Sequence, residues 1–570
     1  MESRERKKEL KLGSLVRALR EDYESPYNSV GNGRDEFIVA ISFLSTLKYK
    51  NRKVDLKEEI RSNDKLADLL HVFEPYIDRK MGLIDQLLEE YEIDLLEAAI
   101  TFDDVYNYRT DLSPTPRGIT ELALNLLKLE EEDVLLDLGS GKGNFIFDSL
   151  ESQEVSKVYG VDINPEAIFT SRVRAYFLGR EVDFREGNII TNDYSGLGAN
   201  KIFSNFPLGL RYRDSLKFVE ENPKLYKYLR NAPMTITHDW LFVLAGALAM
   251  TPGGRFVCLM GKRGTWNAAD KEIRERLVEK GLVEGVIELN SGMLPSRRLE
   301  VSMLIISEGN REVRMVDARE VYTKVGYFFS LLKEEDVARI TELYEKDSAI
   351  SRSVSFAEIA DKGYELSPAR YLEYKDDIKE GMPLGELVKD ISRGAPLSSR
   401  DLSELISKEP TDYRYLLLQN IEDGLIDETL PYLTDLEERY HKYLLKDNSI
   451  ILSRNAPFKV SSVGKLDGEI LATGNLFFLE LDESKIDPLY VEAFLQSDRG
   501  IAQLERLSKG TGITTINIGD LKEVMIPRLP EEEEREIADK FRKDKMKLRM
   551  LMKQLASTRE EKAELFREVK

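Results

Sequence analysis

The pattern of apolar and polar positions divides the chain into five parts. Across residues 1–110 the apolar residues recur at helical spacing, which predicts a helical domain. Across 111–330 short apolar runs alternate with helical patterns, as is typical of an α/β fold with a mostly parallel sheet. Residues 331–380 are expected to form a helical connector, 381–530 an α+β domain with short strands, and 531–570 one long charged helix.

A glycine-rich loop follows the first predicted strand of the α/β region. The strand Val134–Leu136 leads into Asp137 and then into Gly139, Gly141 and Gly143, after which a helical pattern begins. Glycines at alternate positions let the backbone approach a ligand closely, and an acid at the carboxyl end of a strand can hold a charged or hydroxylated group. We therefore expect a cofactor site here, and the alternative is a glycine-rich turn in an unrelated α/β domain.

The second predicted strand of this region, Val158–Val161, ends in another acid, Asp162. Its distance along the chain from Asp137 suits a carboxylate that holds ribose hydroxyls. A dinucleotide site would carry Gly-x-Gly-x-x-Gly, whereas this chain has Asp-x-Gly-x-Gly-x-Gly. The pattern resembles the loop of S-adenosylmethionine-dependent methyltransferases with a Rossmann-like core. The resemblance implies S-adenosylmethionine as cofactor, with Asp137 at its methionine end and Asp162 at its ribose.

Two further segments are candidate cofactor contacts. Thr115 and Pro116 precede a predicted helix and are either a plain helix start or, as the methyltransferase resemblance implies, a cover over the methionine end. Asn188 follows a short predicted strand at Val182–Arg185. It either approaches the adenine ring of the cofactor or only forms a turn, and the sequence leaves both open.

The segment that follows the strand near Ile202 is the candidate catalytic turn. It reads Asn205, Phe206, Pro207 and Leu208, where DNA amino-methyltransferases carry Asn-Pro-Pro-Phe or Asn-Pro-Pro-Tyr, which it resembles. A ring-conjugated amine is a poor nucleophile, so an amide oxygen and a backbone carbonyl are needed to accept its two N–H bonds. An aromatic face stacks on the base, which must first leave the duplex. The resemblance assigns the amide to Asn205 and the carbonyl to Phe206.

The turn departs from the family pattern at two positions. Phe206 replaces the first proline, and Leu208 replaces the stacking aromatic, a loss of about 1–3 kcal/mol of base stacking. Phe206 or Phe203 compensates only if the loop is rotated. The alternative to an active enzyme is therefore a degenerate site that binds cofactor and DNA without efficient transfer.

Further along the chain come the turn Pro252–Arg255, the strand Phe256–Met260 and the segment Tyr364–Tyr371. The order of these motifs resembles the modification subunit of type I restriction–modification systems, from about residue 1 to 375. That resemblance implies adenine-N6 methylation of double-stranded DNA; cytosine N4, RNA or protein methylation would share the asparagine chemistry. No metal or general base is required, because proton loss can follow methyl transfer. No nuclease segment is found, so cleavage would need a separate restriction subunit. Four basic residues on loops are either phosphate contacts or a solvated face: Lys262, Arg263, Arg297 and Arg298.

Residues 381–530 resemble one target-recognition domain of the specificity subunit of the same systems; the alternative is a generic β-rich binding module. The resemblance implies base reading in the duplex, with candidate DNA contacts at Arg454, Asn455, Lys459, Lys509 and Thr511.

The final helix carries Phe541, Leu548, Leu551 and Leu555 at heptad-like spacing. This spacing predicts pairing with a second copy, which would rebuild a two-domain specificity unit. The alternative is a helix that folds back on its own chain.

Composition narrows these expectations. A chain with 42% hydrophobic and 33% charged residues is globular, and a net charge of −20 argues against nonspecific coating of nucleic acid. The single cysteine, Cys258, excludes a disulfide framework and favours a reducing cytoplasmic location. The longest apolar run, Trp240–Met250, is too short to span a bilayer, so no membrane association is expected.

Overall fold

The computed structural model forms two compact units, Met1–Leu372 (unit 1) and Glu373–Lys570 (unit 2). None of the helices in the described part of the chain is long and apolar enough to cross a membrane. The structure describes residues 2–23, 33–101, 115–209, 219–229, 236–294, 300–325, 329–372, 378, 380–427, 429–508 and 514–564.

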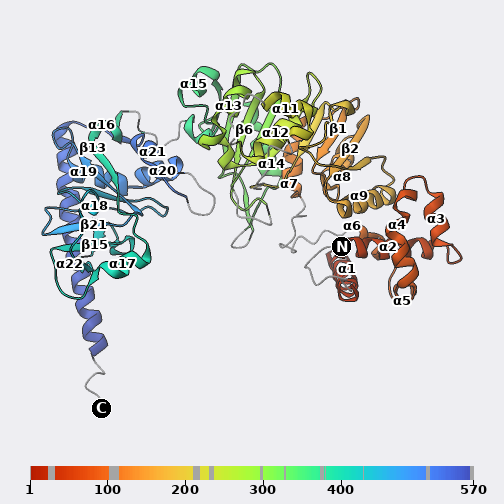
Figure 1. Cartoon of the computed structure of the whole chain (residues 1–570), viewed down its shortest axis with the longest axis horizontal. Helices are drawn as coiled ribbons and strands as arrows, with labels where there is room; N and C mark the ends of the chain where they lie inside the picture. The colour runs from red at the N-terminus through yellow and green to blue at the C-terminus, as the bar shows by residue number, and fades with distance from the viewer. Residues whose placement is uncertain are drawn as a thin grey trace, which may run out of the picture. The chain divides into compact units, whose positions relative to one another are not determined.

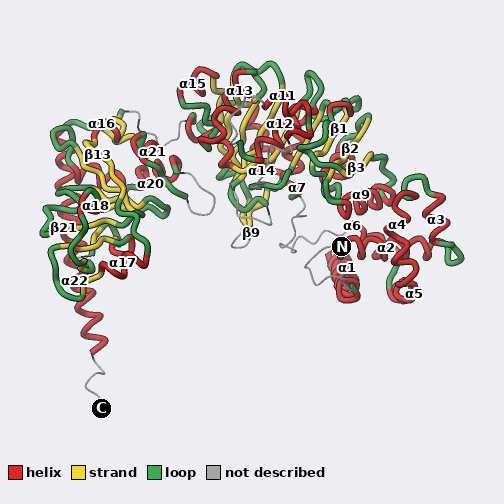
Figure 2. Tube along the Cα trace, in the orientation of Figure 1, coloured by secondary structure: helices red, strands yellow, loops and turns green. Residues whose placement is uncertain are grey.

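The N-terminal region is helical, as predicted, and Figure 2 shows only helices and loops in its described residues. Its buried leucines, isoleucines and phenylalanines form a core of their own, which also takes in Phe169 and Val173 from the next domain. The helical region therefore packs onto the α/β region and belongs to the same unit. Its elements are α1 (Glu2–Asp22), α2 (Arg34–Lys50), α3 (Leu56–Ser62), η1 (Ala67–Leu69), α4 (Leu70–Arg79), α5 (Met81–Glu90) and α6 (Ile93–Thr101).

A nine-stranded sheet forms the centre of unit 1, in the order β11-β8-β6-β7-β5-β4-β1-β2-β3. Figure 1 labels β1, β2 and β6 of this sheet. The strands β3, β2, β1, β4 and β5 are parallel, whereas β7 runs antiparallel to both β5 and β6. The strands are β1 (Val134–Leu138), β2 (Lys157–Asp162), β3 (Asp183–Glu186), β4 (Lys201–Ser204), β5 (Arg255–Gly261), β6 (Val283–Leu289), β7 (Val301–Ser307), β8 (Glu312–Ala318) and β11 (Ser351–Ser355).

Helices and a small hairpin complete this α/β region. The inner strands are almost wholly apolar because helices cover them, and their side chains form the largest core of the chain. Cys258 lies in this core on β5. The elements are α7 (Arg117–Leu127), α8 (Asn144–Ser152), α9 (Pro165–Phe177), η2 (Ser195–Leu197), α11 (Pro223–Leu229), α12 (His238–Ala249), η3 (Lys262–Thr265), η4 (Ala268–Asp270), α13 (Lys271–Glu279), β9 (Thr323–Val325), β10 (Phe329–Leu331), α14 (Glu334–Glu345), α15 (Phe356–Asp361) and η5 (Pro368–Arg370).

The segment 331–380 differs from the predicted helical connector. It contains α14 and α15, but between them β11 pairs antiparallel with β8 and forms one edge of the central sheet. Val337 and Ile340 of α14 are buried in the core of the sheet. Most of this segment is thus part of the α/β region, a long-range pairing that local helical periodicity does not reveal.

Unit 2 has the predicted α+β composition, with two four-stranded sheets in the orders β13-β22-β19-β20 and β14-β18-β15-β21. Its elements are β12 (Gly381–Pro383), α16 (Leu384–Leu387), β13 (Val388–Arg393), α17 (Ser399–Leu405), β14 (Ile406–Ser407), β15 (Tyr413–Leu416), η6 (Leu418–Asn420), β16 (Ile421–Glu422), β17 (Leu425–Ile426), β18 (Tyr432–Leu433), α18 (Glu438–His441), β19 (Ile450–Ser453), β20 (Val460–Ser462), β21 (Glu469–Ala472), β22 (Leu476–Leu481), α19 (Pro488–Gln496), α20 (Asp498–Leu507), α21 (Ile518–Lys522), β23 (Met525–Pro527) and α22 (Glu531–Glu564).

The long final helix α22 packs in part on its own unit. Ala538 is fully buried in the unit 2 core, and the Lys545 ammonium reaches the buried carboxylate of Glu492 on α19 at 2.5 Å. Beyond this contact Leu551 and Leu555 are about half exposed. The helix therefore folds back on its own chain over its first half, and the predicted apolar seam is divided between an inward part and an exposed part.

Candidate functional site

The candidate site lies at the point in the central sheet where the strand order reverses. From β1 the chain continues to β2 and β3 on one side, while β4 and β5 lie on the other side. Ligands of open α/β sheets bind beyond the carboxyl ends of the strands at such a point. Asp137 lies near the end of β1, directly opposite Phe203 of β4, and Asn205 follows β4. The predicted cofactor acid and the predicted catalytic asparagine therefore meet at one edge of the sheet.

Asp137 is buried without a complete set of hydrogen-bond partners. Its side chain is 2% exposed, and its Oδ1 atom accepts no hydrogen bond from any residue that the structure describes. Burial, together with the negative charge of Asp162, raises the pKa of Asp137 well above its ordinary value. A buried carboxyl oxygen without a partner is costly, so this site suits a ligand that brings a positive charge or a hydrogen-bond donor. The ammonium and sulfonium groups of S-adenosylmethionine fit that requirement.

The glycine loop is shaped by Asp162. One carboxyl oxygen of Asp162 accepts the backbone N–H of Gly141 at 2.8 Å, and the other accepts that of Asn164 at 2.8 Å. Burial raises the pKa of Asp162, and these backbone N–H groups oppose the rise. Gly139 has φ of 86°, and a Cβ placed there would lie 3.9 Å from the carbonyl oxygen of Asn205. A side chain at Gly139 would be strained and would narrow the space between the two loops.

The helical region reaches the same loop, which the sequence did not indicate. Lys142, between Gly141 and Gly143 of the loop, forms an ion pair of 2.6 Å with Asp35 at the start of α2. Gly143 has φ of 83° at the start of α8. The ion pair is mostly shielded from solvent and joins residues that are far apart along the chain. Their pairing is therefore visible only in the folded structure.

A second contact links the helical N-terminal region with the α/β region. The Glu166 carboxylate, on α9, accepts the backbone N–H groups of Gly33 and Glu36, each at 3.1 Å. These donors belong to the first turn of α2, whose N–H groups have no partner within the helix. Glu166 thus caps α2 and holds it beside the cofactor loop.

Asn205 is oriented by Thr115. The Asn205 Nδ2 atom donates a hydrogen bond to the Thr115 hydroxyl oxygen at 3.0 Å. Pro116 follows at the start of α7. The structure therefore brings the predicted Thr115–Pro116 segment to the catalytic turn, and it connects Thr115 with Asn205.

The two altered positions of the turn face the protein interior. Phe206 is 1% exposed and stacks on Phe242 with ring centroids 4.8 Å apart, and Leu208 is 5% exposed. Phe203 stacks on Phe145 at 3.8 Å. Both rings already pack in the core in this conformation, so compensation for the missing stacking aromatic after a rotation of the loop stays a prediction. Pro207 is the exposed member of the turn.

Asp239 supports the far end of the turn. Its two carboxyl oxygens accept the backbone N–H groups of Gly209 at 3.3 Å and of Gly261 at 3.0 Å. Burial raises the pKa of Asp239, and these hydrogen bonds oppose the rise. The aspartate therefore holds the end of the catalytic turn next to the end of β5, a role that the sequence did not suggest.

Asn188 serves as a turn residue. Its side-chain oxygen accepts the backbone N–H of Ile190 at 2.8 Å, which is the turn interpretation that the sequence left open. Its contact with adenine stays a prediction.

One of the four basic loop residues, Lys262, is buried. Its Nζ atom lies 3.7 Å from a carboxylate oxygen of Glu288 and 3.5 Å from one of Glu300. It is neither a phosphate contact nor part of a solvated face, because these carboxylates neutralise it in the interior. Arg263 is exposed. Arg297 and Arg298 lie outside the described residues.

The candidate DNA contacts of unit 2 are partly grouped. Arg454 and Asn455 follow β19, and Asn455 forms a backbone bridge with Thr515. Lys459 instead holds a loop, since its ammonium donates to the carbonyl oxygen of Ile421 at 2.6 Å. Lys509 and Thr511 lie outside the described residues. The DNA roles of all five residues stay predictions.

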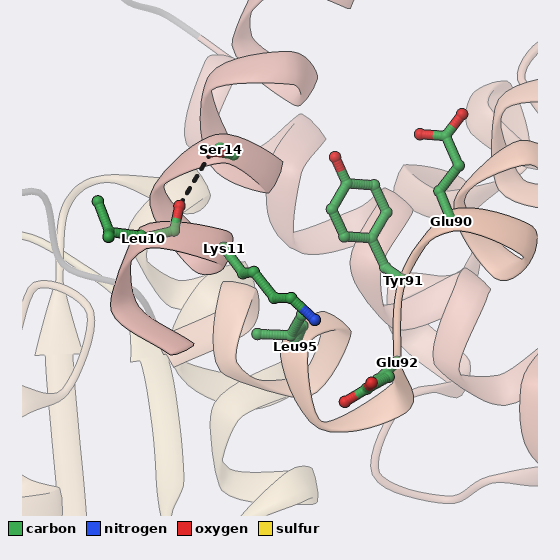
Figure 3. A pocket seen from close by; sticks show the side chains of 7 residues that line it. All are labelled: Leu10, Lys11, Ser14, Glu90, Tyr91, Glu92 and Leu95. Carbon is green, nitrogen blue, oxygen red and sulfur yellow. Dashed lines mark hydrogen bonds between the residues drawn. The ribbon is translucent and has the colours of Figure 1, made fainter. Parts of the chain in front are cut away.

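A pocket of about 270 Å³ lies in the helical region between α1 and the α5–α6 connection (Figure 3). Leu10, Lys11 and Ser14 line one side, and Tyr91 and Leu95 lie across from them. None of these residues belongs to the predicted cofactor or catalytic set. The pocket is therefore separate from the site at the sheet edge.

The sheet order, the glycine loop and the paired acids form an α/β domain that resembles S-adenosylmethionine-dependent methyltransferases. Residues 114–380 match the family model described as N-6 DNA Methylase. This part of the chain is thus similar to N-6 DNA methylase domains.

Curated and solved proteins are also similar to parts of the chain. The chain is 23% identical over 372 residues to the type I restriction enzyme MjaVII methylase subunit of Methanocaldococcus jannaschii, a match that covers 58% of this chain and 63% of that protein. The match thus spans less than two thirds of that relative's own length. The crystal structure of the type IIG restriction endonuclease BpuSI is similar in fold, with a TM-score of 0.51 and 13% identity over 93% of this chain and 74% of that chain. The type I methyltransferase subunit from Streptococcus thermophilus gives a TM-score of 0.47 at 14% identity, over 64% of this chain and 98% of that chain.

Proposed function

We propose that this chain is a site-specific DNA methyltransferase that transfers a methyl group to N6 of an adenine flipped out of the duplex. The observation that carries the proposal is that the unpaired Oδ1 atom of Asp137 and the Asn205 turn lie at the same edge of the sheet. The match of residues 114–380 to N-6 DNA methylases supports the same reaction.

The residues of the turn have separate tasks in this reaction. S-adenosylmethionine supplies the methyl group on a positively charged sulfur. Asp137 would hold the methionine end of the cofactor, and Asp162 would hold its ribose. Asn205 Oδ1 and the carbonyl oxygen of Phe206 would accept the two N–H bonds of the adenine amine, which keeps the nitrogen lone pair directed at the methyl group. The nitrogen loses its extra proton after transfer.

The test is methyl incorporation from labelled S-adenosylmethionine into DNA that lacks adenine methylation, followed by sequencing that locates modified bases. We expect modified adenines in one sequence context with the unaltered chain. Asn205→Ala should abolish incorporation while cofactor binding remains. Asn51→Ala, at an exposed asparagine that ends α2, is the matched control and should leave incorporation unchanged.

A second candidate function follows from the packing of the turn. Because Phe206 and Leu208 are buried, no aromatic ring of the turn is free to stack on a flipped base. This favours a catalytically weak protein that binds cofactor and DNA and acts in assembly. Cofactor and DNA binding without incorporation by the unaltered chain would support this candidate and contradict the first.

We further propose that unit 2 is a target-recognition domain that selects the DNA sequence. Its α+β composition and the grouping of Arg454 and Asn455 at one strand end support this role. Exchange of unit 2 for that of a related protein should change the methylated sequence. Retention of the original sequence after the exchange would contradict the role.

The exposed part of α22 is the proposed contact with a second copy. Leu551 and Leu555 lie there with Met546 and Met550, which are also more than half exposed. Leu551→Glu with Leu555→Glu should convert a dimer to a monomer in sedimentation at micromolar concentration. A monomer in the unaltered chain, with and without DNA, would exclude the homodimer. A separate restriction subunit as partner stays a proposal, and co-purification from the native host would test it.

A further inference from the structure

Two arginines flank the turn that leads into β22 in unit 2. Arg393 is the last residue of β13 and Arg454 directly follows β19, and both strands pair with β22. Arg393 Nε donates to the carbonyl oxygen of Gly474 at 2.8 Å, and Arg454 Nη1 donates to the same oxygen at 3.4 Å. Two cationic side chains therefore converge on one neutral acceptor at one edge of this sheet.

Neither arginine has an ion-pair partner in the part of the chain that the structure describes. Arg454 lies over the ring of Phe477 at 5.5 Å, and its Nε is buried with no hydrogen-bond partner. Desolvation, with the neighbouring charge of Arg393, lowers the pKa of Arg454. By contrast, Arg400 and Arg528 of the same unit each contact a glutamate. Within the described residues the two arginines are therefore not neutralised by a carboxylate.

The backbone around the pair is held in place. The Arg454 N–H donates to the carbonyl of Asn475 at 2.9 Å, and its carbonyl accepts the N–H of Ile516 at 2.9 Å. Gly394, next to Arg393, packs so closely that an added Cβ would lie 2.2 Å from the Thr473 carbonyl oxygen. The two guanidinium groups are thus presented by ordered strand ends, which reduces the entropy lost when they bind an anion.

We propose that Arg393 and Arg454 together bind a phosphate of the DNA backbone and position unit 2 on the duplex. This inference rests on the proposed function in DNA modification and names one place where DNA is held. Guanidinium groups present several N–H donors in a planar arrangement that matches phosphate oxygens. A phosphate at this edge would supply the negative charge that no described carboxylate provides by an ion pair with either arginine. Arg393 was not among the residues that the sequence singled out.

The experiment measures the affinity of the full-length chain for double-stranded DNA, by fluorescence anisotropy, at several salt concentrations. Arg393→Gln and Arg454→Gln should each weaken binding by about tenfold and reduce the slope of log affinity against log salt by about 1. Arg454→Lys, which keeps the charge, should retain most of the slope. The matched control is Arg400→Gln, which removes an exposed arginine already paired with Glu404 and should change neither quantity.

Three results would overturn the proposal. Arg393→Gln with unchanged affinity and slope is decisive, since Arg393 is exposed and its loss is not expected to unfold the unit. The second result is that inorganic phosphate raises the melting temperature of Arg393→Gln less than that of the unaltered chain, while the DNA affinity of the variant is unchanged. The arginine pair would then be a site for small anions. Preference of the pair for RNA over DNA would also contradict it. In each case methyl incorporation by the unaltered chain tests the proposed function separately, because that assay does not depend on these variants.

Discussion

The Asn205 amide nitrogen donates a hydrogen bond to the Thr115 hydroxyl across 3.0 Å, and the two residues come from loops on different elements. With the nitrogen engaged, the amide oxygen is the end left to accept a hydrogen bond from the substrate amine. An amide free to rotate would present the wrong end part of the time. Thr115 is therefore a positioning residue for the proposed reaction, in addition to its predicted place near the cofactor.

Thr115→Val should lower kcat by about tenfold to a hundredfold, because it removes one hydrogen bond that orients the reacting group. Thr115→Ser keeps the hydroxyl and should restore most of the rate. The measurements are single-turnover methylation and the KM for the cofactor. Equal losses in the Ser and Val variants would contradict the positioning role.

Asp35→Asn should weaken S-adenosylmethionine binding by about fivefold, since the partly shielded ion pair with Lys142 is worth about 1 kcal/mol in holding the glycine loop. Titration calorimetry on the full chain measures this change. Asp78→Asn breaks an exposed ion pair with Lys57 in the same helical region and is the matched control. An unchanged affinity in Asp35→Asn would mean that the helical region only supports the fold.

Asp137→Asn should stabilise the cofactor-free chain and weaken cofactor binding. Since the pKa of Asp137 is raised in the folded state, the folded protein binds its proton more tightly than the unfolded chain does. Its contribution to stability is therefore fully present below the ordinary aspartate pKa and is lost as the pH rises through the raised value. Because asparagine does not ionise, Asp137→Asn removes this loss of stability at higher pH.

The gain in the free energy of unfolding should be about 1–2 kcal/mol at neutral pH and smaller near pH 4. Thermal unfolding of both proteins without cofactor, at pH 4.5 and pH 8, measures the difference. A difference that does not grow with pH would show that Asp137 ionises normally. The cofactor should stabilise the unaltered chain more than the variant.

Phe206→Ala should reduce the free energy of unfolding by about 3–5 kcal/mol, because it removes a buried ring stacked on Phe242. Phe206→Leu should cost less and should leave methylation measurable. Pro207→Ala, at the exposed neighbour, is the control for changes in the turn. If Phe206→Ala were as stable as the unaltered chain but lost affinity for flipped bases, the ring would be a stacking residue after all.

Local sequence patterns predicted the cofactor half of the site. The strand before Asp137, the spaced glycines and the strand that ends in Asp162 all follow from residues close together in the chain. Because the carboxyl ends of parallel strands lie at one edge of a sheet, the position of Asn205 after β4 is consistent with a place near this loop. The helical N-terminal region and the α+β composition of unit 2 follow from local periodicity as well.

Only the tertiary structure decided which side chains face the interior and which distant residues meet. Phe206 and Lys262 carry the residue types of a base-stacking ring and a phosphate contact, yet both are buried by neighbours far along the chain. The Thr115–Asn205 hydrogen bond and the Asp35–Lys142 ion pair likewise join distant segments. Periodicity and spacing record the conformation of a segment, whereas such contacts depend on how whole segments pack, which no local pattern encodes.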